Sequence, residues 1–255
     1  FARAHGLLVG SAPDTFLSPE FQTVRRLIDD GAIGRVITVT ANYVGPGADL
    51  WHPNAGFLYK KGGGPALDMG PYFLTTLAAM LGPIDSVFCY ANRGFDVRNI
   101  HGTPVDVEVM TNYCAVLRFK SGVVANLNLS YDEWKSHLPG MEIYGTDGVV
   151  VAPDPNTMLG SIKLLHAEDF KAYVEAKEQI GEKLEAIYGP ESNKLFTEIE
   201  TVAPRRGNER GAGVADMADA ICTGRAARVS AERGWERTTA AAVIAASGYS
   251  RRTVY

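Results

Sequence analysis

The sequence predicts an α+β fold in which helices cover one face of a large, open and mainly antiparallel sheet. Three observations predict it. Strand and helix patterns come first, a long run of strand patterns with short turns occupies residues 84–152, and helical patterns dominate from residue 168 onward. Strands that are grouped in this way, rather than alternating with helices, are typical of an α+β domain.

The first elements are a strand and a helix. The apolar run Leu7-Leu8-Val9-Gly10 predicts a short strand, which needs neighbours on both faces. No such neighbours are evident in the sequence, so we expect the chain to be truncated before this strand. Ser18-Pro19-Glu20 then supplies an N-cap, a proline suited to the first turn and an early acidic residue, which predicts a helix from there to Gly31.

A second strand and helix follow. Residues 35–44 are rich in β-branched side chains and largely alternate, which predicts a strand with one buried face. A loop rich in Pro, Gly, Trp and His then runs to Gly64. The segment from Asp68 to Leu81 is predicted to be a helix, and Gly82-Pro83 is predicted to end it.

From Ile84 onward, strand patterns are separated by turns. Lys120-Ser121-Gly122 and Thr146-Asp147-Gly148 are turn signals between successive strands, so we expect an antiparallel meander. The predicted strands are residues 84–91, 106–119, 123–131, 140–145 and 148–152.

The last third of the chain is predicted to be mainly helical. Residues 168–188 carry an apolar stripe at helical spacing, which indicates a surface helix. A short strand is predicted at 195–202, and the polar loop 203–210 has a lid-like composition. Two helices close the chain, the first carrying Val214, Met217 and Ile221 and the second running over residues 235–247.

Composition excludes several functional classes. The chain has 255 residues, 25 basic and 29 acidic, and a formal net charge of −4 without a long basic block, which predicts no nucleic-acid partner. It has no apolar run of the ~18 residues that a membrane span requires, and no signal-peptide pattern at its start. Its 3 cysteines are widely spaced, which favours buried thiols in a reducing compartment over disulfides or a metal site. We therefore expect a cytoplasmic protein.

Motif searches give few signals. The dinucleotide fingerprint G-x-G-x-x-G after a strand is missing, and Gly211-Ala212-Gly213 lacks both the strand and the third glycine. Gly62-Gly63-Gly64-Pro65 has no following lysine, so it is not a Walker loop. No local signature of a nucleophile or of a metal-ligand set is present.

The strongest candidate site follows the glycines, in the stretch Asp68-Met69-Gly70-Pro71-Tyr72. Residues four apart share one face of a helix, so the Asp68 carboxylate and the Tyr72 phenol are expected to point into the same space. A phenol beside a carboxylate suits proton transfer to a substrate hydroxyl or carbonyl. The alternative is structural: Asp68 caps the helix and Tyr72 is a packed aromatic side chain.

Two aromatic stretches are weaker candidates. Trp51-His52-Pro53 offers a flat apolar surface beside an imidazole, which suits stacking on a sugar or a nicotinamide ring, although loop packing explains it equally well. Tyr131-Asp132-Glu133-Trp134 ends a strand, and from it Tyr131 and Trp134 are candidates to line the same cavity.

At these residues the chain resembles the Gfo/Idh/MocA family, which includes glucose–fructose oxidoreductase and inositol dehydrogenase. The matching stretches keep the family's order and extend over nearly the whole chain: residues 12–17, 30–34, 51–53, 62–72, 81–83, 142–148, 153–156 and 210–217.

The resemblance implies a division of the protein into two domains. Family members have an N-terminal Rossmann domain that holds NAD or NADP, followed by an α/β domain whose open sheet forms the substrate cavity and pairs with another subunit. Residues 1–17 are therefore expected to be the end of the Rossmann domain, and 18–255 the substrate-binding and oligomerisation domain. A homodimer or homotetramer through the open sheet is expected, with Val107, Val109, Leu127 and Leu129 typical of its alternating positions. The chain alone is expected to be inactive.

The resemblance also implies roles for the candidate residues. Many members carry histidine where this chain has Tyr72, and in the branches that carry tyrosine it is the presumed acid/base. A free phenol ionises only at a pH of about 10, so it needs a nearby cation. The family's Glu-Lys-Pro lysine is missing here, and Lys60 and Lys61 are close only in sequence.

The resulting expectation is a reversible, NAD- or NADP-dependent oxidation of a hydroxyl of a sugar, inositol or related polyol. Tyr72 and Asp68 are the expected catalytic pair, and Trp51 is expected to contact the cofactor. His52, Tyr131 and Trp134 are expected to contact the substrate. The alternative is a non-catalytic sugar-binding or scaffold subunit that uses the sheet only for assembly.

Overall fold

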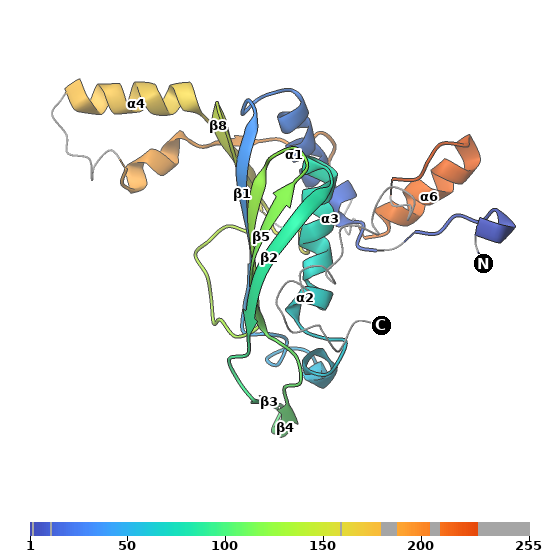
Figure 1. The fold of residues 1–255 in the computed structure, drawn as a ribbon. Coiled ribbons are helices and arrows are strands. Elements are labelled where there is room, and N and C mark those ends of the chain that lie inside the picture. The colour runs from blue at the N-terminus through green and yellow to red at the C-terminus, as the bar shows by residue number, and fades with distance from the viewer. Residues whose placement is uncertain (2, 11, 159, 180–187, 205–209, 229–255) are drawn as a thin grey trace.

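The computed structural model describes residues 1–228 except 2, 11, 159, 180–187 and 205–209 (Figure 1). An eight-stranded sheet forms its centre, in the order β10-β9-β8-β7-β1-β6-β5-β2, and β3 pairs with β4 in a separate hairpin. The strands are β1 Val36–Val44, β2 Ile84–Asn92, β3 Val97–Ile100, β4 Thr103–Asp106, β5 Asn112–Phe119, β6 Val124–Ser130, β7 Met141–Gly145, β8 Gly148–Ala152, β9 Ile162–His166 and β10 Thr197–Ile199.

Helices cover one face of this sheet. In Figure 1, α1, α2 and α3 lie along the same side of the strands, and α4 projects away from the sheet beyond β9. The α-helices are α1 Pro19–Asp29, α2 Pro65–Asp68, α3 Gly70–Leu81, α4 Ala167–Gln179 and α6 Ala212–Thr223, and short 3-10 turns occupy Arg3–His5, Thr15–Leu17, Ala55–Tyr59 and Pro190–Leu195. The predicted α+β architecture is confirmed, and no described helix has both the length and the apolar character that crossing a membrane requires.

The local signals explain the helix ends. The Ser18 hydroxyl accepts a hydrogen bond from the Phe21 N–H at 3.4 Å, with Pro19 in the first turn, as predicted for α1. At the other end of the helical layer, Gly82 stops α3 with a positive φ of 84°, a conformation that costs glycine little.

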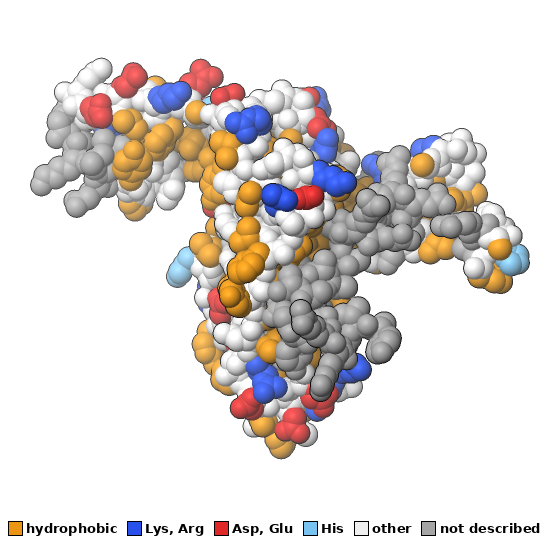
Figure 2. Space-filling model, viewed as in Figure 1, with side chains coloured by type: hydrophobic (Ala, Val, Ile, Leu, Met, Phe, Trp, Pro, Cys, Tyr) orange, Lys and Arg blue, Asp and Glu red, His pale blue; other side chains and the backbone are white. Residues whose placement is uncertain are grey.

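The sheet is amphipathic across its faces. Val39 and Ala41 of β1, together with Leu127 and Leu129 of β6, are buried beneath the helices. The opposite face leaves Phe88, at 61% exposure, and other large side chains in solvent. Figure 2 shows hydrophobic side chains at the surface over the strands and over helix α4.

The predicted meander is wrong at the connection between β6 and β7. Both predicted turns join neighbouring antiparallel strands, β5 to β6 and β7 to β8. However, β1 lies between β6 and β7 and pairs with β6 in parallel and with β7 antiparallel. The connection over residues 131–140 carries no tight-turn signal, so local pattern does not reveal a strand inserted from a distant part of the chain.

The predicted strand 106–119 is also too long, because β5 begins at Asn112. Val107 N–H donates instead to the carbonyl of Asp96, and Glu108 N–H donates to that of Tyr59, so these residues pair with loops rather than with a strand. Three further strands were not predicted: β3 and β4, which form the hairpin, and β9.

Two more corrections concern the first half of the chain. The helix predicted from Asp68 to Leu81 begins earlier and breaks at Met69, because Pro71 has no N–H to donate to the carbonyl of Leu67. The predicted strand at residues 7–10 is absent apart from a single bridge residue, and its leucines and valine are exposed. Described residues give it no neighbouring strand and no covered face, which an apolar strand needs.

Some predicted elements lie partly or wholly outside the described residues. The second closing helix, at 235–247, lies wholly outside them, as does the end of the predicted helix 168–188 at residues 180–187. Most of the loop 203–210 also falls there, apart from Ala203, Pro204 and Arg210.

Candidate functional site

Glycines place Asp68 at the end of α2. A Cβ on Gly63 would lie 2.4 Å from the carbonyl oxygen of Leu58, and the Gly64 N–H donates to that same oxygen at 2.6 Å. Gly64 also has a φ of 85°, so the chain enters the helix through a turn that side chains would block. These glycines therefore fix where Asp68 sits.

The Asp68 carboxylate accepts a short hydrogen bond from the hydroxyl of Tyr131. Tyr131 follows β6 and is 2% exposed. Burial, and then this bond to Asp68, raise the pKa of Tyr131 far above its ordinary value. Its hydroxyl therefore stays a proton donor, which holds one carboxylate oxygen of Asp68 and leaves Oδ1 as the second acceptor.

Tyr72 lies in the first turn of α3, half-buried between the two main apolar clusters. Arg210 Nη1 donates a hydrogen bond to the Tyr72 hydroxyl oxygen at 3.1 Å. The guanidinium carbon lies 5.4 Å from the centroid of the Tyr72 ring, within the range of a cation–π contact. Asp68 and Tyr72 thus belong to consecutive helices, and the hydrogen bonds of the described residues join each of them to a different partner.

Arg210 is held from two sides. Its Nη2 donates to the backbone oxygen of Asn156 at 3.0 Å and to Asn156 Oδ1 at 2.8 Å. The next residue, Gly211, begins the entry into α6, where the Asp14 carboxylate accepts hydrogen bonds from the N–H groups of Gly211 at 3.1 Å and Gly213 at 2.7 Å. Sequence reasoning placed Arg210 in a polar loop and missed its contact with Tyr72.

A buried carboxyl lies next to Asn156. Asp154 Oδ1 accepts a hydrogen bond from the Asn156 N–H at 2.6 Å. Burial raises the pKa of Asp154, although the backbone N–H groups of Asn156 and Thr157 oppose the rise. The pKa of Tyr43 is raised mainly by burial, and then by the negative charges of Asp154 and Asp68. Both carboxylates therefore lie close enough to Tyr43 to influence it.

The predicted Trp51-His52 stretch forms a surface next to the hairpin. His52 Nδ1 accepts a hydrogen bond from the Asn54 N–H at 3.0 Å, so a neutral His52 carries its proton on Nε2. His101, in the hairpin turn, donates from Nε2 to the carbonyl oxygen of His52 at 3.0 Å. The Trp51 ring is 72% exposed and lies edge-on to His52 with centroids 5.5 Å apart.

Trp134 and Tyr131, predicted together, occupy different environments. Trp134 is 77% exposed in the connection between β6 and β7. Tyr131 is buried and packs edge-on against the rings of Tyr43 and Tyr59, with centroids 6.1 Å and 6.3 Å apart. The structure therefore brings Tyr131 to Asp68 and leaves Trp134 at the surface.

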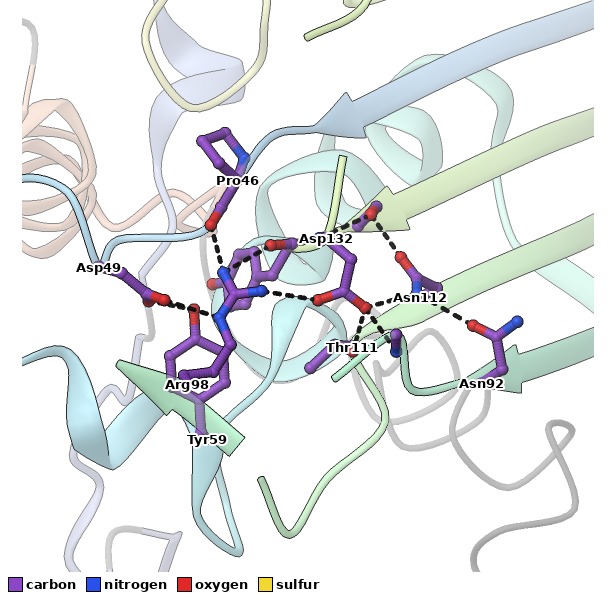
Figure 3. A network of polar contacts seen from close by, with 11 residues as sticks. Pro46, Asp49, Tyr59, Asn92, Arg98, Thr111, Asn112 and Asp132 are labelled. Carbon is purple, nitrogen blue, oxygen red and sulfur yellow. Dashed lines mark hydrogen bonds and ion pairs between the residues drawn. The ribbon is translucent and has the colours of Figure 1, made fainter. Parts of the chain in front are cut away.

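An arginine that the sequence did not single out organises this end of the sheet (Figure 3). Arg98 of β3 donates to Asp49 at 2.6 Å, to Asp132 at 3.1 Å and to the backbone oxygen of Tyr131 at 3.1 Å. It also makes a short bond to the backbone oxygen of Pro46. The hairpin is thus tied to the loop that carries Trp51 and to the end of β6 that carries Tyr131.

Lys60, which is close to Tyr72 in sequence, pairs with Glu108 instead. Lys60 Nζ lies 2.8 Å from Glu108, and this pair, together with a backbone contact from Lys61, lowers the pKa of Glu108. Among the described residues, Arg210 is a cation that contacts Tyr72, since its Nη1 donates to the phenol oxygen. The useful signal in the sequence was the stretch Arg210-Gly211-Ala212-Gly213, whose glycines allow a close helix entry.

One described side chain has a shape that suits a nicotinamide ring. The exposed indole of Trp51 suits a flat ring. The entry of α6, the nearest approach to a phosphate-binding turn, is filled by the Asp14 carboxylate and does not fit a pyrophosphate. Within the described ranges, no group of three or more His, Cys, Asp or Glu side chains could hold a metal ion.

The sequence and the fold match known proteins. Residues 21–151 match the GFO/IDH/MocA C-terminal domain, while no curated protein matches the chain in sequence. The aldose-aldose oxidoreductase from Caulobacter crescentus, complexed with glycerol, has a TM-score of 0.69 and 20% identity over 98% of this chain and 64% of that chain. Levoglucosan dehydrogenase, in complex with NADH and L-sorbose, has a TM-score of 0.66 and 17% identity over 92% of this chain and 62% of that chain.

A third similar structure is an NAD binding oxidoreductase from Klebsiella pneumoniae, with a TM-score of 0.68 and 15% identity over 100% of this chain and 68% of that chain. At these identities the solved structures establish a shared fold. The chain spans 64% and 62% of the first two proteins. The matched domain covers more than half of the chain, and the chain therefore belongs to the GFO/IDH/MocA family.

Proposed function

We propose that the complete protein is an NAD(P)-dependent oxidoreductase that oxidises a hydroxyl of a sugar, inositol or related polyol. This chain supplies the substrate-binding domain. The family match supports the class of reaction, and the glycerol, L-sorbose and NADH in the similar structures support the classes of substrate and cofactor.

The observation that carries the proposal is the hydrogen bond between Arg210 and Tyr72. A guanidinium has donors and no acceptor, so the Tyr72 oxygen must accept this bond. The phenol proton is therefore directed at another acceptor, which suits exchange with a substrate oxygen. A packed structural tyrosine would more often direct its proton at a protein acceptor, as Tyr131 does at Asp68.

Each candidate residue has a defined part in this proposal. During oxidation Tyr72, as the phenolate, takes the proton of the substrate hydroxyl. Asp68, fixed by Tyr131 through one oxygen, accepts a hydrogen bond from a second substrate hydroxyl through Oδ1. His52, whose neutral form carries its proton on Nε2, and the exposed Trp134 contact the sugar. A bound nicotinamide would supply the hydride acceptor, and Trp51 is the residue that would contact it.

The test is Tyr72→Phe in the complete protein. The change keeps the ring and removes the proton carrier, so turnover is expected to fall by ~10²–10⁴ while the thermal midpoint changes little. Tyr144→Phe is the matched control, since it also removes a hydroxyl, one that bonds to Glu142 at 2.6 Å on β7, and it should leave turnover unchanged.

The opposite pattern would refute the proposal. Near-normal turnover with a lowered midpoint in Tyr72→Phe would make Tyr72 a structural residue, because losing a buried hydrogen bond costs ~1–3 kcal/mol of folding energy and leaves the chemistry intact. Absence of any dehydrogenase activity in the unmodified complete protein would support the scaffold alternative.

A further inference from the structure

We propose that Arg210 is the charge partner of Tyr72, and that Asp14 is the positioning residue that holds Arg210 in place. The guanidinium stabilises the phenolate that Tyr72 must become before it can take a proton from the substrate. This inference rests on the proposed function only for its link to turnover, because the charge pairing itself is a property of this chain.

Three contacts fix the guanidinium against the phenol. Nη1 donates to the Tyr72 oxygen at 3.1 Å, and Nη2 donates to the two oxygens of Asn156 at 3.0 Å and 2.8 Å. A charged donor makes a stronger hydrogen bond to an anionic oxygen than to a neutral one. The contact therefore tightens when Tyr72 loses its proton, so it favours the reactive form over the resting phenol.

The charges around the site make such a partner necessary. Asp68 ends the helix before Tyr72, and Asp154 lies next to Asn156. Both carboxylates also raise the pKa of Tyr43. These negative charges oppose the formation of a phenolate. Arg210 supplies an opposing positive charge, because its guanidinium contacts the Tyr72 oxygen and lies over the Tyr72 ring.

Asp14 determines where Arg210 lies. One of its carboxylate oxygens accepts hydrogen bonds from Gly211 and Gly213, which fixes the first turn of α6 immediately after Arg210. A Cβ on Gly213 would lie 2.7 Å from the Asp14 Cβ, so glycine is required for this close approach. Asp14 precedes the 3-10 turn Thr15–Leu17, and it thus connects the start of the chain to the residue beside Tyr72.

The direct test measures the ionisation of Tyr72 in this chain without any cofactor. The ultraviolet absorbance of phenolate is measured as a function of pH in the unmodified chain and in each variant named below. Each of these titrations is repeated in the same protein with Tyr72→Phe added. Their difference isolates Tyr72 from the buried Tyr43, Tyr59 and Tyr131, whose pKa values are raised by burial first. Arg210→Gln should move the midpoint of the difference curve upward, since the phenolate loses the charged donor that contacts its oxygen at 3.1 Å.

Two variants and one control separate charge from structure. Arg210→Lys keeps the charge and should restore most of the shift. Asp14→Ala should move the midpoint in the same direction as Arg210→Gln. Arg118→Gln, which changes an exposed arginine paired with Asp85 on β2, should leave the midpoint unchanged. An unchanged midpoint in Arg210→Gln would overturn the pairing, and an unchanged midpoint in Asp14→Ala would overturn the role of Asp14.

Activity of the complete protein gives the second readout. The pH profile of kcat/KM for oxidation should move upward in Arg210→Gln by about as much as the titration does, with an unchanged thermal midpoint. If Tyr72→Phe remains active while Arg210→Gln still moves the midpoint of the phenolate difference curve, the proposed function fails and the charge pairing stands. If Tyr72→Phe is inactive but Arg210→Gln changes neither curve, the proposed function stands and this inference fails.

Discussion

Replacing Arg98 with methionine should destabilise the fold strongly. The side chains of Arg98, Asp49 and Asp132 are 9%, 10% and 8% exposed, so both ion pairs are buried. Methionine has a similar length but no charge, and it would leave both carboxylates without their guanidinium. Removing one partner of a buried ion pair costs ~3–5 kcal/mol.

The remaining hydrogen bonds place the expected loss at the lower end of that range. Asp132 keeps donors from Thr111, Asn112 and the Gly94 N–H, and Asp49 keeps the Tyr59 hydroxyl. We therefore expect a decrease of about 3 kcal/mol in the free energy of unfolding. The loop that carries Trp51 should also loosen, because Asp49 and Pro46 lose their contacts with β3.

Urea denaturation followed by circular dichroism measures this decrease by linear extrapolation. Arg118→Met is the matched control, because Arg118 pairs with Asp85 while their side chains are 63% and 39% exposed. An exposed pair contributes ~0–1 kcal/mol. If the Arg98 and Arg118 variants lose equal stability, the reasoning that burial makes the Arg98 network strong is refuted.

Three further outcomes are expected. Calorimetric titration of this chain with NAD or NADP should show no measurable binding, and a micromolar Kd would contradict the reasoning that Asp14 fills the entry of α6 and leaves no place for a pyrophosphate. The chain should associate through its open sheet face, so light scattering should find a smaller species when Phe88 and Tyr90, 61% and 72% exposed, are both changed to serine; identical masses would contradict this interface. Since burial raises the pKa of Asp154, the folded state binds that proton more tightly than the unfolded state, and the resulting stability is lost as pH rises through the folded pKa. Asp154→Asn should therefore raise the thermal midpoint at pH 7 but not at a pH of about 3, below the ordinary carboxyl pKa; an equal effect at both would contradict it.

The sequence by itself determined the elements whose signals are local. Ser18 and Pro19 begin α1, Gly82 ends α3, and both tight turns of the sheet were recognised from their residue types. These signals are read within a few residues, because capping bonds and positive φ angles depend on the immediate neighbours. The glycines before α2 are a local signal of the same kind.

Only the tertiary structure decided which side chains meet. Tyr72 and Asp68 are four residues apart, yet Pro71 separates their helices, and their partners Arg210 and Tyr131 come from distant segments. The insertion of β1 between β6 and β7, and the bonds of Arg98 to Asp49 and Asp132, are equally non-local. Such contacts depend on the packing of the whole sheet and its helical layer, and no periodicity in the chain encodes that packing.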